Sequence, residues 1–304
     1  MKKISKTLSV CVLCSVFCAL PSCIVDEDTT LDMKGMFSPQ GEVVDTRFEQ
    51  SMAYDNQRGE LHLDMHSDDY TVFICTDSHI TRSTHRNLDY FIDQYKAAQG
   101  PKLAIHLGDL IDAQKNIPCV DSIVHFAGQT KADTLLATPG NHDIYFKQWP
   151  IFRDFFQTSV YWFDTRNGDK KLDLYICLDT AEGTLGSKQW KWLRELLAQK
   201  SKEGYRRIIV YTHTHFWKLD GSQGHTSNFA IEETYELAHT LSEYGVEFVW
   251  SGHQHARQSV RYKNVNYLVF DATKDSETGT GYAVVEVGSS MIYHYLDYPC
   301  DCDQ

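Results

Sequence analysis

The sequence has little positive charge for its length. Lys and Arg together number 29 against 41 Asp and Glu in 304 residues, so the formal net charge is −12 at pH 7. An acidic surface repels polyanions, which disfavours general binding of nucleic acids. Any phosphate group that this protein handles must therefore be attracted locally, by bound cations.

Long hydrophobic runs are also missing, since the apolar block at residues 8–20 is too short to cross a bilayer as a helix. Three lysines precede this block, a combination typical of a secretory signal peptide. The block ends in Leu20-Pro21-Ser22-Cys23, which resembles a bacterial lipoprotein box. We therefore expect residues 1–22 to be removed and Cys23 to carry a lipid. The protein would then be exported and anchored by that lipid alone to the bacterial outer membrane, on its periplasmic or cell-surface face.

Plainer interpretations of this N-terminal region stay open. One is an ordinary helix in which Cys23 has no special role. The acidic run at residues 24–28 resembles the surface-export signal of bacterial lipoproteins, but it also fits a solvated tether. We predict a tether and N-terminal arm over residues 23–61, a single folded domain over residues 62–298, and a tail over residues 299–304.

The sequence lacks patterns that would indicate other classes of protein. No cysteines have zinc-finger spacing, no Gly-x-Ser-x-Gly segment indicates a covalent serine hydrolase, and no internal repeat is present. Cys75 and Cys177 lie in apolar runs and are expected to be inert core residues. Cys300 and Cys302 lie in the tail, where an exported protein could oxidise them, but the sequence does not give their pairing.

From Tyr70 onward the chain alternates strand and helix patterns, which predicts an α/β fold. One helix is expected over residues 84–99, and another begins near Gly186 with Ser187 as its N-cap. Residues 257–296 alternate with turns and predict antiparallel strands. We expect those strands to close a second sheet against the first.

Residues that can bind metals follow the predicted strands. The apolar run at residues 72–75 stops at Thr76, and Asp77 and His79 come directly after it. Four later strands also end in residues of this kind, and the full set is Asp77, His79, Asp109, Asn141, His213, His253 and His255. Because ligands bind at the carboxyl ends of strands in open α/β sheets, we expect these side chains to converge at one edge of the sheet.

The composition of this set indicates two metal ions, divalent or of mixed valence. Two carboxylates, four imidazoles and one amide are too many ligands for one four-coordinate zinc, but they suit two ions that share a carboxylate. Such a pair suits phosphoryl transfer. The ligand types fit Mn, Fe, Zn, Co or Ni, and the sequence does not choose among them. The alternative, that these residues only cap turns, would require five ordered blocks to arise by chance.

The ordered blocks Asp-x-His, Gly-Asp-x-x-Asp, Gly-Asn-His-Asp, His and Gly-His-x-His resemble those of the calcineurin-like metallophosphoesterase superfamily, over about residues 70–296. Purple acid phosphatases and class III cyclic-nucleotide phosphodiesterases are similar. The resemblance implies a four-layer α/β sandwich, in which two mixed β-sheets are flanked by helices. It further implies that one metal is held by Asp77, His79, Asp109 and His255, and the other by Asp109, Asn141, His213 and His253.

The same resemblance implies the chemistry. A hydroxide between the metals would attack phosphorus in line, His142 would protonate the leaving alkoxide, and Asp112 would orient His142. The substrate would be a small phosphate ester, and the sequence does not decide between a monoester, a diester and a cyclic nucleotide. The oligomeric state is likewise open.

The substrate side of the site is less clearly defined. Relatives similar to cyclic-nucleotide phosphodiesterases usually carry a proline two residues after the fourth-block histidine, where this chain has His215. His215 either supports the ligands or faces the substrate, and His225, in a glycine-flanked loop, could also reach it. Two competing functions are a non-catalytic surface protein that uses the fold to bind a ligand or partner, and a hydrolase with a Ser or Cys nucleophile.

Overall fold

The structure is a computed structural model that describes residues 43–81, 85–112, 135–218, 226 and 228–299. All of these residues belong to one compact unit, Pro39–Gln304. The predicted signal peptide, Cys23, His225, Cys300 and Cys302 lie outside the described residues. Among the described helices, none is both long and apolar enough to span a membrane.

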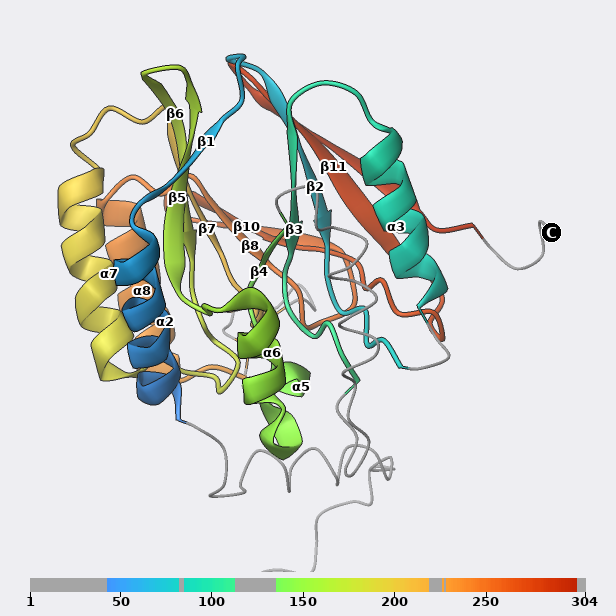
Figure 1. The fold of residues 1–304 in the computed structure, drawn as a ribbon. Coiled ribbons are helices and arrows are strands. Elements are labelled where there is room, and N and C mark those ends of the chain that lie inside the picture. Colours follow the sequence, from blue (N-terminus) through green and yellow to red (C-terminus); the bar gives the residue numbers. More distant parts are fainter. Residues whose placement is uncertain (1–42, 82–84, 113–134, 219–225, 227, 300–304) are drawn as a thin grey trace, which may run out of the picture. The chain divides into compact units, whose positions relative to one another are not determined.

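Two mixed β-sheets form the centre of the described fold (Figure 1). The larger sheet has the strand order β1 (Leu61–Asp64), β5 (Tyr161–Asn167), β6 (Lys170–Cys177), β7 (Arg207–Tyr211), β8 (Phe248–Ser251), β10 (Val265–Val269) and β9 (Gln258–Tyr262). The smaller sheet has the order β12 (Met291–Asp297), β11 (Gly281–Val287), β2 (Tyr70–Cys75), β3 (Lys102–His106) and β4 (Leu135–Ala137). Strands β2, β3 and β4 run parallel to one another, as do β6, β7, β8 and β10.

Helices cover the outer faces of both sheets, which confirms the predicted four-layer α/β sandwich (Figure 1). On the side of the larger sheet lie α2 (Val44–Arg58), α7 (Gly186–Lys200) and α8 (Ile231–Glu243). Helix α3 (Arg86–Ala97) lies on the smaller sheet. The short elements α5 (Asn141–Ile144), η1 (Tyr145–Lys147) and α6 (Trp149–Phe156) follow β4.

Strand β2 shows why its sequence is a continuous apolar run. Val72 and Ile74 are buried in the core between the two sheets, while Phe73 and Cys75 are buried against α3 on the other face. A strand covered on both faces has no polar positions to alternate with its apolar ones. The run ends where the strand leaves the core, and the metal-ligand residues begin there.

Helix α2 was not predicted, because the face that it buries is partly polar. Its buried residues are Val44, Arg47, Phe48 and Ser51, which have helical spacing but only two apolar members. Arg47 forms a two-bond ion pair with Asp179, in which Nε lies 2.8 Å from Oδ2 and Nη2 lies 3.1 Å from Oδ1. Both side chains are fully buried, so α2 is an integral part of the folded unit.

Two other predictions are wrong. Ser187 is not the N-cap of α7 but lies in its first turn, and its hydroxyl donates to Asp45 of α2 over 2.8 Å. The strands after residue 257 do not close one separate sheet: β9 and β10 extend the larger sheet, and β11 and β12 extend the smaller one. Strands β9 and β12 are partly exposed edge strands, and the alternation in their sequences does not specify which sheet they will join.

Candidate metal centre

The seven predicted ligands converge from strands of both sheets, rather than from the edge of one sheet as the sequence analysis expected. Asp77 and His79 follow β2, Asp109 follows β3, Asn141 follows β4, His213 follows β7, and His253 and His255 follow β8. The carboxyl ends of the two parallel strand sets therefore meet at this place. The buried sandwich supplies the rigid support, and the strand-end turns supply the polar groups.

The backbone is strained at most of these positions. The angle φ is 50° at Asp77, 42° at His79, 52° at Asp109, 71° at His253 and 58° at His255. A non-glycine residue held in this left-handed region costs on the order of 1–3 kcal/mol, and such residues gather at functional sites. Five strained residues that all carry metal-binding side chains indicate that their placement serves a function.

Glycines let the strand ends approach closely. A Cβ atom on Gly108, whose φ is 92°, would lie 2.6 Å from Nδ1 of His213 and 2.8 Å from the amide nitrogen of Gly140. A Cβ atom on Gly252 would lie 2.5 Å from Oδ2 of Asp77. Any larger residue at these two positions would push the ligand-bearing turns apart.

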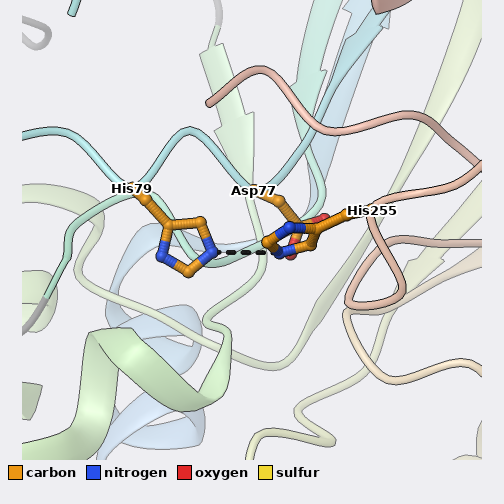
Figure 2. A group of neighbouring side chains, drawn as sticks. All are labelled: Asp77, His79 and His255. Atoms are coloured by element: carbon orange, nitrogen blue, oxygen red, sulfur yellow. Dashed lines mark hydrogen bonds and ion pairs between the residues drawn. The ribbon is translucent and has the colours of Figure 1, made fainter. Parts of the chain in front are cut away.

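Asp77, His79 and His255 form the first ligand group (Figure 2). Nε2 of His79 and Nε2 of His255 lie 3.2 Å apart, and Nε2 of His255 lies 3.3 Å from Oδ1 of Asp77. This carboxylate oxygen is buried and has no hydrogen-bond partner among the described residues. A buried, negatively charged oxygen that faces two imidazole nitrogens fits a divalent metal ion, which would satisfy all three atoms at once.

Asp109, His213 and His253 form the second group. Nε2 of His213 lies 3.2 Å from Oδ2 of Asp109, 3.1 Å from Nδ1 of His253 and 3.1 Å from Oδ1 of Asn141. Oδ2 of Asp109 also lies 3.7 Å from Nε2 of His79. Asp109 therefore stands between the two groups.

Neighbouring polar groups orient the imidazole rings. Nδ1 of His213 donates to the carbonyl oxygen of Leu107 over 2.8 Å, which leaves Nε2 for a ligand bond. Nδ1 of His255 lies 2.8 Å from both carboxylate oxygens of Glu277. Glu277 was missed by the sequence analysis, although carboxylates that hold a ligand histidine in this way are a general feature of metal sites.

Asn228 was missed as well, and its side-chain amide lies 2.8 Å from Nε2 of His253. Since Nδ1 of His253 is the nitrogen that faces His213, this contact fixes the ring from its other side. Neither Glu277 nor Asn228 follows a buried strand, so neither carries the strand-end signal that revealed the ligands.

Charge within the centre shifts the pKa values in opposite directions. Burial alone would raise the pKa of Asp77 and Asp109, but the nearby imidazoles hold both below their usual range. Burial lowers the pKa of His213, yet the Asp109 carboxylate outweighs it and raises the value to about 9. Burial likewise lowers the pKa of His255, while the neighbouring carboxylates of Asp77 and Glu277 raise it to about 10. A metal must therefore displace protons from these two imidazoles.

His142 and Asp112 lie next to Asp109, the carboxylate between the two ligand groups. The backbone N–H of His142 donates to Oδ1 of Asp109 over 2.8 Å, and the His142 ring packs at 85° to that of His79, with 4.5 Å between ring centroids. Nδ1 of His142 lies 3.4 Å from Oδ1 of Asp112. The structure thus places an imidazole with a carboxylate neighbour at the rim of the ligand groups.

Asp143 joins the turns that carry two of the ligands. This fully buried carboxylate accepts backbone N–H groups of Gly140 at 2.8 Å, Ile111 at 3.1 Å and Leu110 at 3.3 Å. Burial, followed by the charge of Asp109, raises the pKa of Asp143 to about 7. Asp143 belongs to the Gly-Asn-His-Asp block, but its part in holding the turns together could not be read from the sequence.

Two further histidines, His106 and His215, are buried near the ligands. His106 is fully buried, with Nε2 2.7 Å from the hydroxyl of Ser78 and Nδ1 accepting the N–H of Gly108, so it is a satisfied core residue. His215 is 3% exposed, and its ring centroid lies 5.7 Å from that of His253. Its contact with a substrate stays a prediction.

Comparisons with known proteins agree with this geometry. The sequence profile of a family described as calcineurin-like phosphoesterase matches residues 70–257, which include all seven predicted ligands. No curated protein matches the chain.

Solved structures share the fold. The chain is similar to GAP50, the anchor in the inner membrane complex of Plasmodium, with 12% identity and a TM-score of 0.52 over 75% of this chain and 84% of that one. It is also similar to the purple acid phosphatase PPD1 from yellow lupin (Lupinus luteus) seeds, with 14% identity and a TM-score of 0.54 over 75% of this chain and 51% of that one. The chain thus matches about half the length of the lupin enzyme. Likeness at these identities shows the fold alone, whereas the family match covers more than half of the chain and carries the ligand blocks. The chain belongs to the calcineurin-like phosphoesterase family.

Proposed function

We propose that this protein hydrolyses phosphate esters of small molecules at a centre of two divalent metal ions. The observation that carries the proposal is the position of Asp109, whose Oδ2 lies 3.2 Å from His213 of one ligand group and 3.7 Å from His79 of the other. A carboxylate in this position suits a ligand shared by two ions. The family match supports phosphoester chemistry.

The ligands divide as the geometry of the two groups suggests. One ion would be held by Asp77, His79, Asp109 and His255, and the other by Asp109, Asn141, His213 and His253. Mn, Fe, Zn, Co and Ni all fit these donors. When bound, such a pair of cations polarises a phosphate ester and makes hydroxide available near neutral pH.

His142 is the proposed general acid, and Asp112 is the residue that positions it. Asp112 lies beside Nδ1 and can orient the ring, which leaves Nε2 to give a proton to the departing oxygen. The hydrogen bond from the His142 backbone to Asp109 keeps the ring next to the ligands. Proton transfer of this kind contributes most when the leaving group is a poor one, such as an alkoxide.

The expected substrate is a small phosphate ester. The net charge of −12 disfavours polyanionic substrates, and cations at the centre would attract a single phosphate group locally. Relative rates on a monoester and a diester would decide between these two substrate classes.

The test is hydrolysis of p-nitrophenyl phosphate and bis-p-nitrophenyl phosphate with Mn²⁺, before and after treatment with a chelator. We expect turnover of at least one substrate, its loss on chelation and its recovery when Mn²⁺ is restored. Chelator-insensitive hydrolysis would contradict the metal mechanism and favour a side-chain nucleophile. Bound metal without turnover of either substrate would instead support a non-catalytic binding protein.

We further propose that the protein is exported and anchored by a lipid on Cys23. The support is the leader at residues 1–22 and the lipoprotein-type sequence that ends at Cys23. In the bacterium of origin, the wild-type protein should sediment with the membrane fraction and the Cys23→Ala variant should not. Equal sedimentation of the two would contradict the anchor without affecting the proposed chemistry.

A further inference from the structure

A small cavity with a mostly apolar lining lies next to the metal centre and is bordered by His215. Its other walls come from Trp217 in the segment after β7 and from side chains of β9 and β10, including Val260, Tyr267 and Val269. The volume available to the centre of a water-sized molecule is about 10 Å³. His215 separates this cavity from His253, whose ring centroid lies 5.7 Å away.

Three polar atoms in the residues around this cavity are buried without a partner. They are Nδ1 of His215, Nε1 of Trp217 and the hydroxyl oxygen of Tyr267, and none of them has a hydrogen bond to any described residue. The three residues are only 3%, 6% and 5% exposed. Buried polar groups in native proteins are almost always hydrogen-bonded. Three polar atoms without a hydrogen-bond partner around one cavity therefore require an explanation.

The three groups do not bond to one another. Val260 and Val269 offer them no polar atom, and the polar side chains of Ser251 and Gln258, which also border the cavity, form no hydrogen bond with them. A water molecule can. The indole N–H of Trp217 only donates, the hydroxyl of Tyr267 donates or accepts, and the imidazole Nδ1 of His215 can accept. One water would accept from Trp217, donate to His215 and use its second hydrogen or lone pair for Tyr267. Three hydrogen bonds are typical of buried water.

We propose that this cavity is a binding site for one water molecule, held by Trp217, Tyr267 and His215. A volume of about 10–15 Å³ by this measure is what a single water needs. The bound water would fix the His215 ring beside His253, which makes His215 a supporting residue between a buried water and the metal centre. The water site follows from burial and hydrogen bonding, and it stands whether or not the protein is an enzyme.

The direct test is a crystal structure of the wild-type protein at a resolution that shows ordered water. The expected result is one density peak within about 2.7–3.2 Å of all three atoms. A dry cavity, or side chains rearranged so that the three groups bond directly to protein atoms, would overturn the proposal.

A thermal unfolding experiment gives an independent answer, because the two possibilities predict effects of opposite sign. If the Tyr267 hydroxyl bonds to water, Tyr267→Phe removes a hydrogen bond and should lower the unfolding midpoint by about 2–4 °C relative to wild type. If the hydroxyl instead lies in a dry cavity, the same change removes a buried polar group that has no hydrogen-bond partner. The unfolding midpoint would then be equal to that of wild type or higher, and this result would overturn the proposal.

The matched control is Tyr262→Phe. The Tyr262 ring packs against Trp217 with 4.6 Å between ring centroids, but Tyr262 does not line the cavity. This variant reports what the loss of a tyrosine hydroxyl does elsewhere in the same aromatic group. The water site predicts that the midpoint of the Tyr267→Phe protein falls below that of the control, and an equal or higher midpoint would count against it.

Discussion

Two fully buried carboxylates, Asp77 and Asp173, lie at opposite ends of the parallel strands and differ in their hydrogen-bond and ion-pair partners. Asp173 accepts from Nε of Arg206 at 3.0 Å and from the hydroxyl of Tyr70 at 2.8 Å. Its backbone N–H donates to Thr165 over 3.2 Å. The chain itself thus provides the positive charge and the hydrogen bonds that this carboxylate needs.

Among the described residues, no arginine forms an ion pair with Asp77. Its Oδ2 accepts from the hydroxyl of Thr76 at 2.7 Å and from the N–H of His253 at 2.9 Å, but its Oδ1 has no hydrogen bond among the described residues. Its nearest cationic group is an imidazole, and its own backbone is left-handed. The contrast indicates that Asp173 stabilises the fold, whereas Asp77 and its neighbours are arranged for a cation from outside the chain.

The largest effect should come from the shared carboxylate. Asp109→Asn removes the one ligand that stands between the groups, and we expect kcat/KM to fall roughly 10³-fold, which corresponds to the several kcal/mol that metal ions supply. Initial rates with Mn²⁺ measure this. The control is Asp154→Asn, at a side chain that is 70% exposed and belongs to neither ligand group. Comparable activity in the two variants would remove Asp109 from the mechanism.

Metal binding should also depend strongly on pH. His213 and His255, with pKa values of about 9 and about 10, carry protons in the metal-free protein at pH 7, and each of the two ions must replace one of these protons. The affinity for each ion should therefore rise with pH up to about 9, by as much as roughly 10-fold per pH unit, and fall as the solution is acidified. Calorimetric titration with Mn²⁺ in buffers of different ionisation enthalpy would show about two protons released per chain. No proton release would contradict the charges assigned to these rings.

His142→Asn should lower kcat by about 10²-fold on a substrate with an alkoxide leaving group, because the proton donor is lost. The loss on p-nitrophenyl phosphate should be smaller, since that leaving group needs less assistance. Steady-state rates on the two substrates give the comparison, and His239→Asn, at a side chain that is 66% exposed, is the control. An equal loss on both substrates would argue against a role as acid.

Asp173→Asn should lower the stability of the fold and leave the activity unchanged, unlike the substitutions at the metal centre. It leaves Arg206, which is 24% exposed, without its carboxylate, and we expect the free energy of unfolding to fall by about 3 kcal/mol. The activity per folded molecule should not change, because the ligand groups lie at the other end of the strands. Urea denaturation and initial rates on the same sample test both halves. Lost activity in the fully folded variant would show that the two regions are not independent.

The smallest effect should come from Glu277→Gln. An amide still reaches Nδ1 of His255 but no longer carries the charge that raises the basicity of the ring. Metal affinity should fall about 10- to 100-fold, with little change in stability. Competition with a chromogenic chelator measures the affinity. Glu286→Gln, at a side chain that is 61% exposed, is the matched control, and equal affinities in the two variants would contradict the role of Glu277.

The sequence predicted the ligands because each follows a strand that is buried on both faces. At Asp77, as at His213, an apolar run stops abruptly and a polar residue follows, which locates both the end of the strand and the edge of the sheet. The family resemblance and the fold class are confirmed.

The remaining features depend on contacts between distant parts of the chain. Glu277 and Asn228 lie in irregular segments whose positions are set by the tertiary fold, so nothing local distinguishes them from other polar loop residues. Helix α2 was not predicted because Arg47, a charged residue, occupies its inward face. Arg47 is neutralised by Asp179, 132 positions later, and by Glu182, at 3.5 Å. The division of the last four strands between two sheets was not predicted, because the pattern within a strand does not specify its pairing partner.

The most direct test of the central claim is a crystal structure of metal-loaded protein, with anomalous scattering recorded at the absorption edge of the bound metal. The account predicts two peaks per chain, with the carboxylate of Asp109 in contact with both. A single peak, or two peaks neither of which contacts Asp109, would contradict it.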